Sequence, residues 1–250
     1  MLTRLKTDRT SPRHVLFMPT HAGNIFPYLP IASQITGASA SGVENRYGDA
    51  SIAEQASGLA RDLRDTLPKG AEVICAGWSF GGTLAYEVAS ALSEAGLRGV
   101  SAVLIDAPVA GPDNRAEPFL AIDDRFCEFF VDKAGFEMKP YPSLRTLKDA
   151  LQAVDPRLTD DLVDQLYLRY ALNQARWLRY APSPGNVPVL QLRAVQSDWP
   201  DQNFRAWEAA CTRYGQRRTP GDHYSAIAGK NAAAIAAVLS EDACALATQH

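Results

Sequence analysis

A serine in a glycine-rich turn is the feature of this sequence that points most directly to chemistry. Ser79 lies within residues 77–82, Gly-Trp-Ser-Phe-Gly-Gly, between the apolar run 73–76 and a helix-forming stretch. A strand, a sharp turn with Gly-x-Ser-x-Gly and then a helix are typical of a nucleophile elbow, which exposes the serine hydroxyl at the carboxyl end of the strand. The N-terminus of the helix favours negative charge that develops there. We therefore predict that Ser79 is a nucleophile.

A serine nucleophile needs a general base, and the sequence offers four histidines. His14 falls in or beside the first predicted strand, and His250 is the last residue. His21 follows the first strand, where an oxyanion donor is expected rather than a base. His223 lies in a polar loop after the last predicted strand, where this chain order places its histidine. The sequence therefore predicts His223 as the base.

The carboxylate that would orient the base has two candidates. Asp106 ends the strand that follows the serine helix, and Asp198 follows the later apolar strand 187–195. Both positions give the chain order Ser, Asp, His, so the order does not decide between them. Asp222 is adjacent to His223 and is interpreted as a loop-forming residue.

The same chemistry requires two N–H groups that stabilise a tetrahedral oxyanion. We expect one to be the backbone N–H of Phe80, directly after the nucleophile. The other is expected from the loop after the first strand, at Thr20 or its neighbour His21.

Composition and charge exclude several other classes of function. The chain has 250 residues, a formal net charge of −3 and 46% hydrophobic residues, which is ordinary for a globular protein and gives no sign of nucleic-acid binding. The N-terminus lacks a secretory signal, and no apolar stretch is long enough to span a membrane. The four cysteines are scattered, and the histidines lack metal-ligand spacing. We expect a cytoplasmic protein without a metal site.

Strands that alternate with helices predict a mostly parallel, doubly wound α/β sheet. Together with the serine turn, this arrangement resembles the α/β-hydrolase fold. A capping box is predicted at Ser51, and helices are expected over residues 25–35 and 203–214. Residues 1–13 are polar and are interpreted as a loose leader. The whole chain, 1–250, is interpreted as one domain in which residues 111–185 form a helical insertion.

The predicted insertion carries much of the aromatic content of the chain. One helical face holds Phe126, Phe129 and Phe130, and another holds Leu162, Leu166, Tyr170 and Trp177. Ordinary helix packing accounts for many of these residues. The functional interpretation is a lid over an apolar acyl pocket, to which the three phenylalanines and Trp177 contribute.

Over nearly its whole length the chain resembles the thioesterases that release products from nonribosomal peptide and polyketide synthases. Residues 77–82 followed by 85–89 are similar to the nucleophile segment of that family, and residues 221–224 are similar to its histidine loop. Residues 18–26 resemble its oxyanion loop, which usually has Gly or Ala where this chain has Thr20 and His21.

The resemblance favours Asp106 as the acid, because such domains carry it after the strand that follows the serine helix. Some stand-alone editing thioesterases place it after the later strand, so Asp198 stays open. The resemblance also implies a substrate, an acyl or peptidyl chain in thioester linkage to the phosphopantetheine arm of a carrier protein. It implies release through acyl-Ser79, by hydrolysis or cyclisation, with no resident cofactor.

Three other functions remain open. They are a stand-alone editing, or type II, thioesterase, a general carboxylesterase of the same fold, and a non-catalytic docking module.

Two groups of basic residues also have alternative interpretations. Arg213, Arg217 and Arg218 either meet an acidic carrier protein or form a solvated face. The basic residues of segment 1–13 fit a linker remnant or the start of a free-standing protein.

Overall fold

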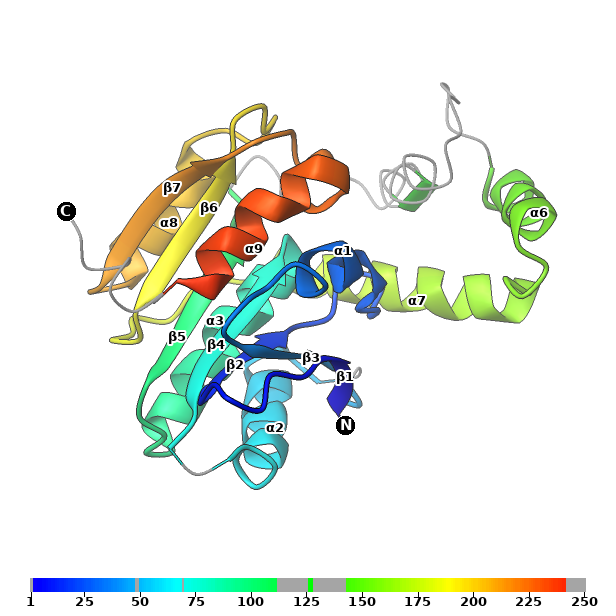
Figure 1. The fold of residues 1–250 in the computed structure, drawn as a ribbon. Helices are drawn as coiled ribbons and strands as arrows, with labels where there is room; N and C mark the ends of the chain where they lie inside the picture. Colours follow the sequence, from blue (N-terminus) through cyan, green and yellow to red (C-terminus); the bar gives the residue numbers. More distant parts are fainter. Residues whose placement is uncertain (1, 48–49, 69, 112–125, 128–142, 242–250) are drawn as a thin grey trace.

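The computed structural model describes residues 2–47, 50–68, 70–111, 126–127 and 143–241. Its centre is a seven-stranded sheet with the strand order β1-β3-β2-β4-β5-β6-β7 (Figure 1). All neighbouring strands are parallel except β1 and β3, which are antiparallel. The predicted α/β fold with a mostly parallel sheet is confirmed.

The strands are β1 (Leu2–Lys6), β2 (Arg13–Phe17), β3 (Ser39–Val43), β4 (Glu72–Trp78), β5 (Val100–Ile105), β6 (Val189–Ala194) and β7 (Tyr214–Thr219). The α-helices are α1 (Leu29–Ala32), α2 (Ile52–Arg64), α3 (Phe80–Glu94), α6 (Leu144–Val154), α7 (Asp160–Trp177), α8 (Gln202–Ala210) and α9 (Ala232–Ser240). Three short 3-10 helices are η1 (Phe26–Tyr28), η2 (Ser225–Ile227) and η3 (Gly229–Asn231).

Helices cover both faces of the sheet, and this explains the apolar runs of the central strands. All residues of β5 and β6 are buried, as a strand covered on both sides requires. Alternate side chains enter opposite cores. Cys75 and Leu104 pack in the core formed with α2, α3 and α8, whereas Ile74 and Val103 pack in the core formed with α1 and α9.

The prediction of a loose leader is wrong for residues 2–6, because they form β1. This strand pairs with β3, with Leu2 opposite Val43. Leu2 and Leu5 are partly buried, and each packs against one of the two cores. Thr3 and Arg4 are exposed. The strand is short and largely polar because it forms the edge of the sheet, so its sequence contains no continuous apolar run.

At the other edge of the sheet, the predicted helix 203–214 is too long. The helix α8 ends at Ala210, and Tyr214 already begins β7. The sequence Tyr-Gly-Gln-Arg-Arg-Thr of β7 lacks the apolar run that marks the inner strands. An edge strand needs apolar residues on only part of its surface, which is why the sequence pattern missed it.

Helix starts and ends follow local signals where these are strong. The predicted capping box at Ser51 is present, because the Ser51 and Glu54 side chains each accept a hydrogen bond from the backbone N–H of the other. The predicted helix 25–35 is shorter than expected. It forms η1 and the four-residue α1, since Pro27 and Pro30 interrupt regular helix hydrogen bonding.

In the sequence, α6 and α7 come between β5 and β6. In space, they extend from the side of the sheet (Figure 1). The cap at Thr159 is present, since its side chain accepts a hydrogen bond from the Leu162 N–H. The predicted inner face of α7 is partly wrong, because Leu162 is exposed. The buried residues of α7 are Val163, Tyr170, Asn173, Gln174 and Trp177.

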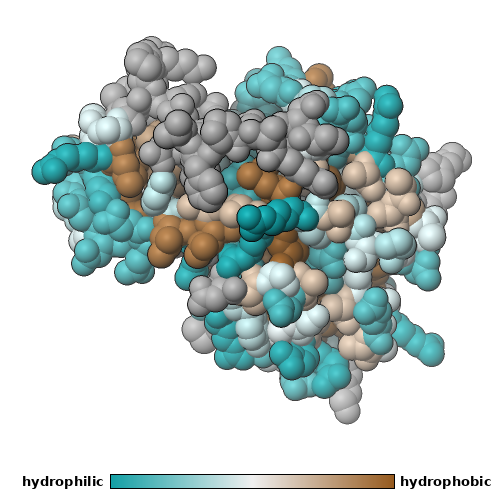
Figure 2. Space-filling view, turned by 180° about the vertical axis from the view of Figure 1, so that it is seen from behind, coloured by the Kyte–Doolittle hydropathy of each residue, from teal (hydrophilic) through white to brown (hydrophobic). Residues whose placement is uncertain are grey.

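Several large apolar side chains on this side of the molecule are exposed. Leu168 and Leu172 lie one turn apart on α7, and Phe26 and Leu29 lie at the start of η1 and α1. Figure 2 shows apolar residues along the side of the molecule that carries α7. Within the described ranges, no helix has the length and apolar character needed to cross a bilayer.

Candidate active site

Ser79 occupies the sharp turn between β4 and α3. Its backbone has φ 55° and ψ −124°, a conformation that residues with a side chain rarely adopt. The flanking glycines are required by close packing. A Cβ on Gly77 would collide with the carbonyl of Gly81, and a Cβ on Gly82 would collide with Ala107. The predicted elbow is therefore present, and α3 begins directly after the serine.

Two buried hydrogen bonds hold the elbow in place. The Ser79 N–H donates to the carbonyl of Ile105 at the end of β5, with 3.0 Å between N and O. The Trp78 N–H donates to the hydroxyl oxygen of Tyr28, also at 3.0 Å. Tyr28 is completely buried, and burial raises the pKa of its hydroxyl. No pattern in the sequence predicts that Tyr28 supports the turn.

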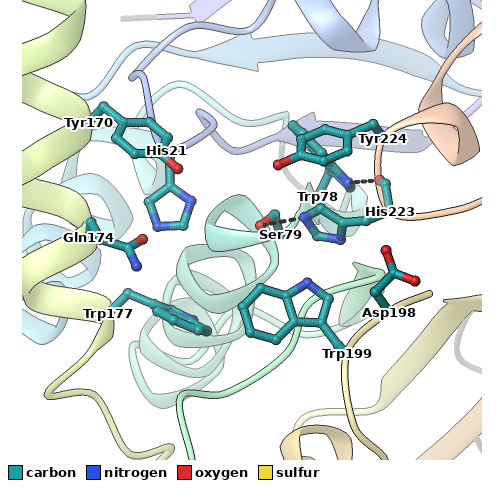
Figure 3. Close-up of a pocket in the computed structure, with 10 residues that line it drawn as sticks. All are labelled: His21, Trp78, Ser79, Tyr170, Gln174, Trp177, Asp198, Trp199, His223 and Tyr224. Carbon is teal, nitrogen blue, oxygen red and sulfur yellow. Dashed lines mark hydrogen bonds between the residues drawn. The ribbon is translucent and has the colours of Figure 1, made fainter. Parts of the chain in front are cut away.

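The structure brings Ser79, His223 and Asp106 into one hydrogen-bonded line. His223 Nε2 lies 3.1 Å from Ser79 Oγ (Figure 3), and His223 Nδ1 lies 2.8 Å from Asp106 Oδ2. Asp106 is fully buried, and the other two side chains are nearly so. In the tautomer that suits this line, Nδ1–H donates to the carboxylate and Nε2 accepts the serine proton.

Two further donors hold the Asp106 carboxylate. The Ala194 N–H donates to Oδ1 and the Ser197 hydroxyl donates to Oδ2, both at 2.9 Å. The Asp106 backbone has φ 41°, in the left-handed region. The loop after β6, which contains Ser197, therefore fixes the carboxylate that orients His223.

Asp198, the other acid candidate, directly follows Ser197 in the chain, but it does not belong to the hydrogen-bonded line that Asp106 completes. It is exposed and lines the pocket around Ser79 (Figure 3). The hydrogen bond to Nδ1 of His223 comes from Asp106. The geometry therefore assigns the third position of the line to Asp106.

The histidine loop is shaped by its own side chains. Asp222 Oδ1 accepts hydrogen bonds from the N–H groups of Tyr224 and Ser225, at 2.9 and 2.8 Å. This agrees with the interpretation of Asp222 as a loop-forming residue. The Trp78 indole N–H donates to the carbonyl of His223 at 2.7 Å (Figure 3), which joins the histidine loop to the elbow.

The loop after β2 contains Thr20 and His21, the two candidates for the second oxyanion donor. The Thr20 N–H donates to the Asn24 carbonyl at 3.0 Å, so this amide is engaged within the loop. The Thr20 carbonyl accepts from the Gly23 N–H at 2.8 Å, which fixes the peptide plane that carries the His21 N–H. The Thr20 N–H therefore already has an acceptor, and His21 is the remaining candidate for the second donor; this role stays a prediction. Phe80 begins α3, so its N–H has no acceptor within the helix.

A cavity of about 140 Å³ surrounds Ser79 and His223. Aromatic side chains form most of its wall, and Trp177 of the predicted lid is one of them (Figure 3). The described lining residues are His21, Trp78, Ser79, Tyr170, Gln174, Trp177, Asp198, Trp199, His223 and Tyr224. A nucleophile, a base and an aromatic wall thus meet at the carboxyl ends of β4 and β5.

The thioesterase domain family matches residues 15–242 of the chain. This protein is a member of that family. The prediction of the family from the serine and histidine segments is confirmed, and with it the assignment as a thioesterase.

Known proteins of related sequence and structure agree with this assignment. The thioesterase is 31% identical over 108 residues to a non-reducing polyketide synthase of Pseudevernia furfuracea. That match includes 40% of this chain and 5% of the synthase, so this chain is far shorter than the relative it matches.

Two solved structures share the fold of the thioesterase. The Vlm2 thioesterase domain, solved with a bound dodecadepsipeptide, has a TM-score of 0.71 and 19% identity, with 95% of each chain covered. YbtT, the type II thioesterase of a yersiniabactin nonribosomal peptide and polyketide pathway, has a TM-score of 0.69 and 17% identity, with 100% of each chain covered.

Trp177 lines the pocket of the thioesterase, whereas the described lining contains none of the phenylalanines predicted with it. Phe126 is fully buried and is absent from the described pocket lining. It packs against Tyr167 and Tyr170, with ring centroids 5.2 and 5.5 Å away. A role of Phe126 in a larger acyl pocket stays a prediction. Phe129 and Phe130 lie outside the described residues.

Sequence reasoning missed several residues of the thioesterase pocket. Trp78, Trp199 and Tyr224 each follow or precede a predicted site residue, and this adjacency could have identified them. Tyr170 and Gln174 lie seven and three residues before the predicted Trp177 on α7, a spacing that places all three on one face of a helix.

The thioesterase shows no other centre of metal or thiol chemistry in its described part. No group of three or more His, Cys, Asp or Glu residues there could hold a metal ion. Cys75, Cys127 and Cys211 are buried and form no disulfide among the described residues. Burial raises the pKa of Cys75 and of Cys211 to about 12, which keeps both protonated and unreactive at neutral pH.

The arginines predicted to meet a partner lie at the β7 edge of the thioesterase. Arg217 and Arg218 belong to β7, and Arg213 directly precedes it. Arg217 Nη1 lies 3.3 Å from Glu241 Oε2, so this side chain is already paired. Arg213 and Arg218 are exposed. A role in partner binding stays a prediction.

Proposed function

We propose that this protein is a serine thioesterase that releases an acyl, polyketide or peptidyl chain from the phosphopantetheine arm of a carrier protein. The observation that supports this most strongly is the line Ser79 Oγ, His223 Nε2, His223 Nδ1, Asp106 Oδ2, with 3.1 and 2.8 Å between the paired atoms. This line lies in a pocket with an aromatic wall, which suits an acyl chain.

In the first half-reaction, Ser79 Oγ attacks the thioester carbonyl carbon while His223 Nε2 takes the serine proton. Asp106 stabilises the imidazolium that forms. The N–H groups of Phe80 and His21 stabilise the oxyanion of the tetrahedral intermediate. When the intermediate collapses, the carbon–sulfur bond breaks, and the thiol of the arm leaves with the proton from His223.

The second half-reaction releases the chain from the serine ester. A nucleophile attacks the acyl-Ser79 carbonyl, and His223 takes its proton and returns one to Ser79. Water gives a free acid, and a hydroxyl or amine within the chain gives a ring. The reaction requires no resident cofactor, because the phosphopantetheine arm belongs to the carrier protein.

The related proteins support this substrate class. The synthase relative is a polyketide synthase, the Vlm2 domain was solved with bound depsipeptides, and YbtT belongs to a nonribosomal peptide and polyketide pathway. These are properties of those proteins. We infer from the sequence resemblance that the chain released by this protein is bound to a carrier protein.

The test is intact-protein mass spectrometry of the enzyme after mixing with acyl-carrier thioesters. We expect an acyl adduct on wild type, its absence from Ser79→Ala, and its presence on the control Ser57→Ala, which alters an exposed serine of α2. The mass of the released product separates a free acid from a ring. An adduct on Ser79→Ala equal to that on wild type would reject the proposal.

The alternative functions predict different results in the same assay. A general carboxylesterase would turn over a simple oxygen ester faster than the carrier thioester of the same acyl group. An editing thioesterase would release short or aberrant chains faster than the mature product. A docking module would show no adduct with any substrate and no labelling by a fluorophosphonate.

A further inference from the structure

Gln174 is a buried amide that faces the reaction pocket. It lies on α7 between Tyr170, one turn before it, and Trp177, one turn after it, and all three line the cavity with Ser79. Only 4% of the Gln174 surface is exposed. Figure 3 shows its side chain directed from α7 into the pocket, on the side of Ser79 opposite to His223.

The neighbouring polar side chains of α7 have partners in the protein, whereas the Gln174 side chain has none among the described residues. The Asn173 amide donates to the His21 carbonyl at 2.8 Å, and the Trp177 indole donates to the Pro108 carbonyl at 3.0 Å. The Gln174 side-chain amide makes no such hydrogen bond within the described part of the chain. The amide instead faces the pocket that holds Ser79, where it can both donate and accept a hydrogen bond.

The rest of the wall near Gln174 offers mainly aromatic surface. Tyr170, Trp177 and Trp199 line the same cavity, and a plain alkyl chain in contact with them would leave the amide without a hydrogen bond. Asp198 is the one carboxylate among the described lining residues, so its charge disfavours an anionic chain. The group that fits beside Gln174 is therefore polar and not anionic, and an amide, which can donate and accept, is suited to an uncharged carbonyl or hydroxyl group.

We propose that Gln174 determines specificity for acyl chains that carry an uncharged hydrogen-bonding group, a carbonyl or a hydroxyl, a few atoms from the thioester. This inference rests on the proposed thioesterase function and names the substrate class of the same site. It also departs from the expectation of a purely apolar acyl pocket. A pocket built to hydrogen-bond its substrate rejects the analogue that lacks the polar group.

The test compares kcat/KM for N-acetylcysteamine thioesters of hexanoate with those of 3-hydroxyhexanoate and of 3-, 4- and 5-oxohexanoate. We expect wild type to prefer at least one polar chain over hexanoate by about tenfold, the scale of one hydrogen bond. Gln174→Met keeps the length of the side chain and removes its amide. In this variant the preference should fall about tenfold, toward one.

Two further variants make the result specific. Gln165→Met introduces the same change at an exposed glutamine of α7 and should keep the wild-type preference. Gln174→Glu offers an acceptor but no donor at neutral pH, so it should keep a preference for a hydroxyl group and lose one for a carbonyl group. It also provides a second test if Gln174→Met fails to fold.

Equal kcat/KM values for polar and alkyl chains in wild type would overturn the role of Gln174. A preference that persists in both Gln174 variants would overturn it as well. In both cases, turnover of hexanoyl thioester by wild type and its loss in Ser79→Ala would leave the thioesterase function intact. No turnover of any thioester by wild type would instead reject the function, and the inference with it.

Discussion

The side-chain amide of Asn173 donates to the backbone carbonyl of His21, with 2.8 Å between the atoms. This bond joins α7 to the loop that carries the candidate oxyanion donor. One turn earlier on α7, the Arg169 side chain fills the space that a Cβ on Gly23 of the same loop would need. The position of α7 and the shape of the oxyanion loop are therefore coupled, since a shift of one breaks contacts with the other.

Replacement of Asn173 by Leu should lower kcat about tenfold to a hundredfold and change KM little. The reason is that the loss of an oxyanion donor itself costs about 10²–10³ in kcat, and this change only loosens the support of that donor. The measurement is steady-state kinetics with an acyl thioester, together with the unfolding midpoint of the variant.

Gln55→Leu is the matched control for Asn173→Leu. Gln55 is fully buried on α2, and its amide also donates to a backbone carbonyl, that of Ala50 at 2.8 Å. It should lower stability without a selective loss of kcat. A normal kcat in Asn173→Leu, or an equal loss in both variants, would contradict the role of the Asn173–His21 bond.

Asp106→Asn should reduce kcat by about 10⁴, because an amide at this position stabilises the wrong tautomer of the histidine. Asp198→Asn should stay within about threefold of wild type in turnover of a small thioester, since Asp106 already pairs with His223. Single-turnover acylation of Ser79 measures both variants. The opposite ranking of the two would assign the acid to Asp198.

We also expect that the catalytic carboxylate can be transferred from position 106 to position 197, whose side chain hydrogen-bonds to Asp106. Ser197 Oγ lies 2.9 Å from the Asp106 carboxylate, so a carboxylate at position 197 would lie next to His223. We expect Asp106→Ser combined with Ser197→Asp to regain at least about tenfold of the kcat lost in Asp106→Ser alone. The single variant retains Asp198 and thereby shows whether that residue can substitute. Identical rates in the single and double variants would rule out the transfer.

Tyr28→Phe should lower the free energy of unfolding by about 1–2 kcal/mol, because the buried Trp78 N–H loses its acceptor. Urea unfolding followed by fluorescence measures the change. Tyr47→Phe removes a hydroxyl that donates to the partly exposed carboxylate of Asp62, and it should cost less than about 0.5 kcal/mol. Equal effects in the two variants would show that the elbow does not depend on Tyr28.

His14 should make the protein less stable as the pH falls below 6.5. Burial, with a smaller contribution from the charge of Arg4, lowers the pKa of His14 below its ordinary value of 6.5. Below pH 6.5 the unfolded chain then binds more protons than the folded one, which favours unfolding. Between pH 7.5 and 5, the free energy of unfolding should fall more for wild type than for His14→Gln. Parallel curves for the two proteins would contradict this prediction.

The inner part of the fold was predictable because its signals are local. A strand buried on both faces must be apolar along its length, so β2, β4, β5 and β6 could be recognised from their runs. The edge strands β1 and β7 could not, because half of their surface faces solvent and their sequences are polar. Pro27 and Pro30 marked the end of regular helix, although the predicted helix ran through them.

The candidate site was predictable to the extent that its residues have distinctive neighbours along the chain. Ser79 and His223 lie in segments with clear turn chemistry, and the structure joins them. The choice between Asp106 and Asp198 depends on which carboxylate reaches His223 in space, and chain order carries no information on this. Gln174 had no signal of its own, since a glutamine on a helix usually faces solvent.

The backbone of the described residues shows a further property of the serine and the acid. Apart from glycines, Ser79 and Asp106 are the two described residues with positive φ, at 55° and 41°. Such conformations cost on the order of 1–3 kcal/mol each, and glycine would relieve this strain at either position. The native state is thus less stable than the same fold could be, and the energy is stored at the two positions where a side chain is needed for catalysis. A protein that served only as a scaffold would have no reason to retain this strain.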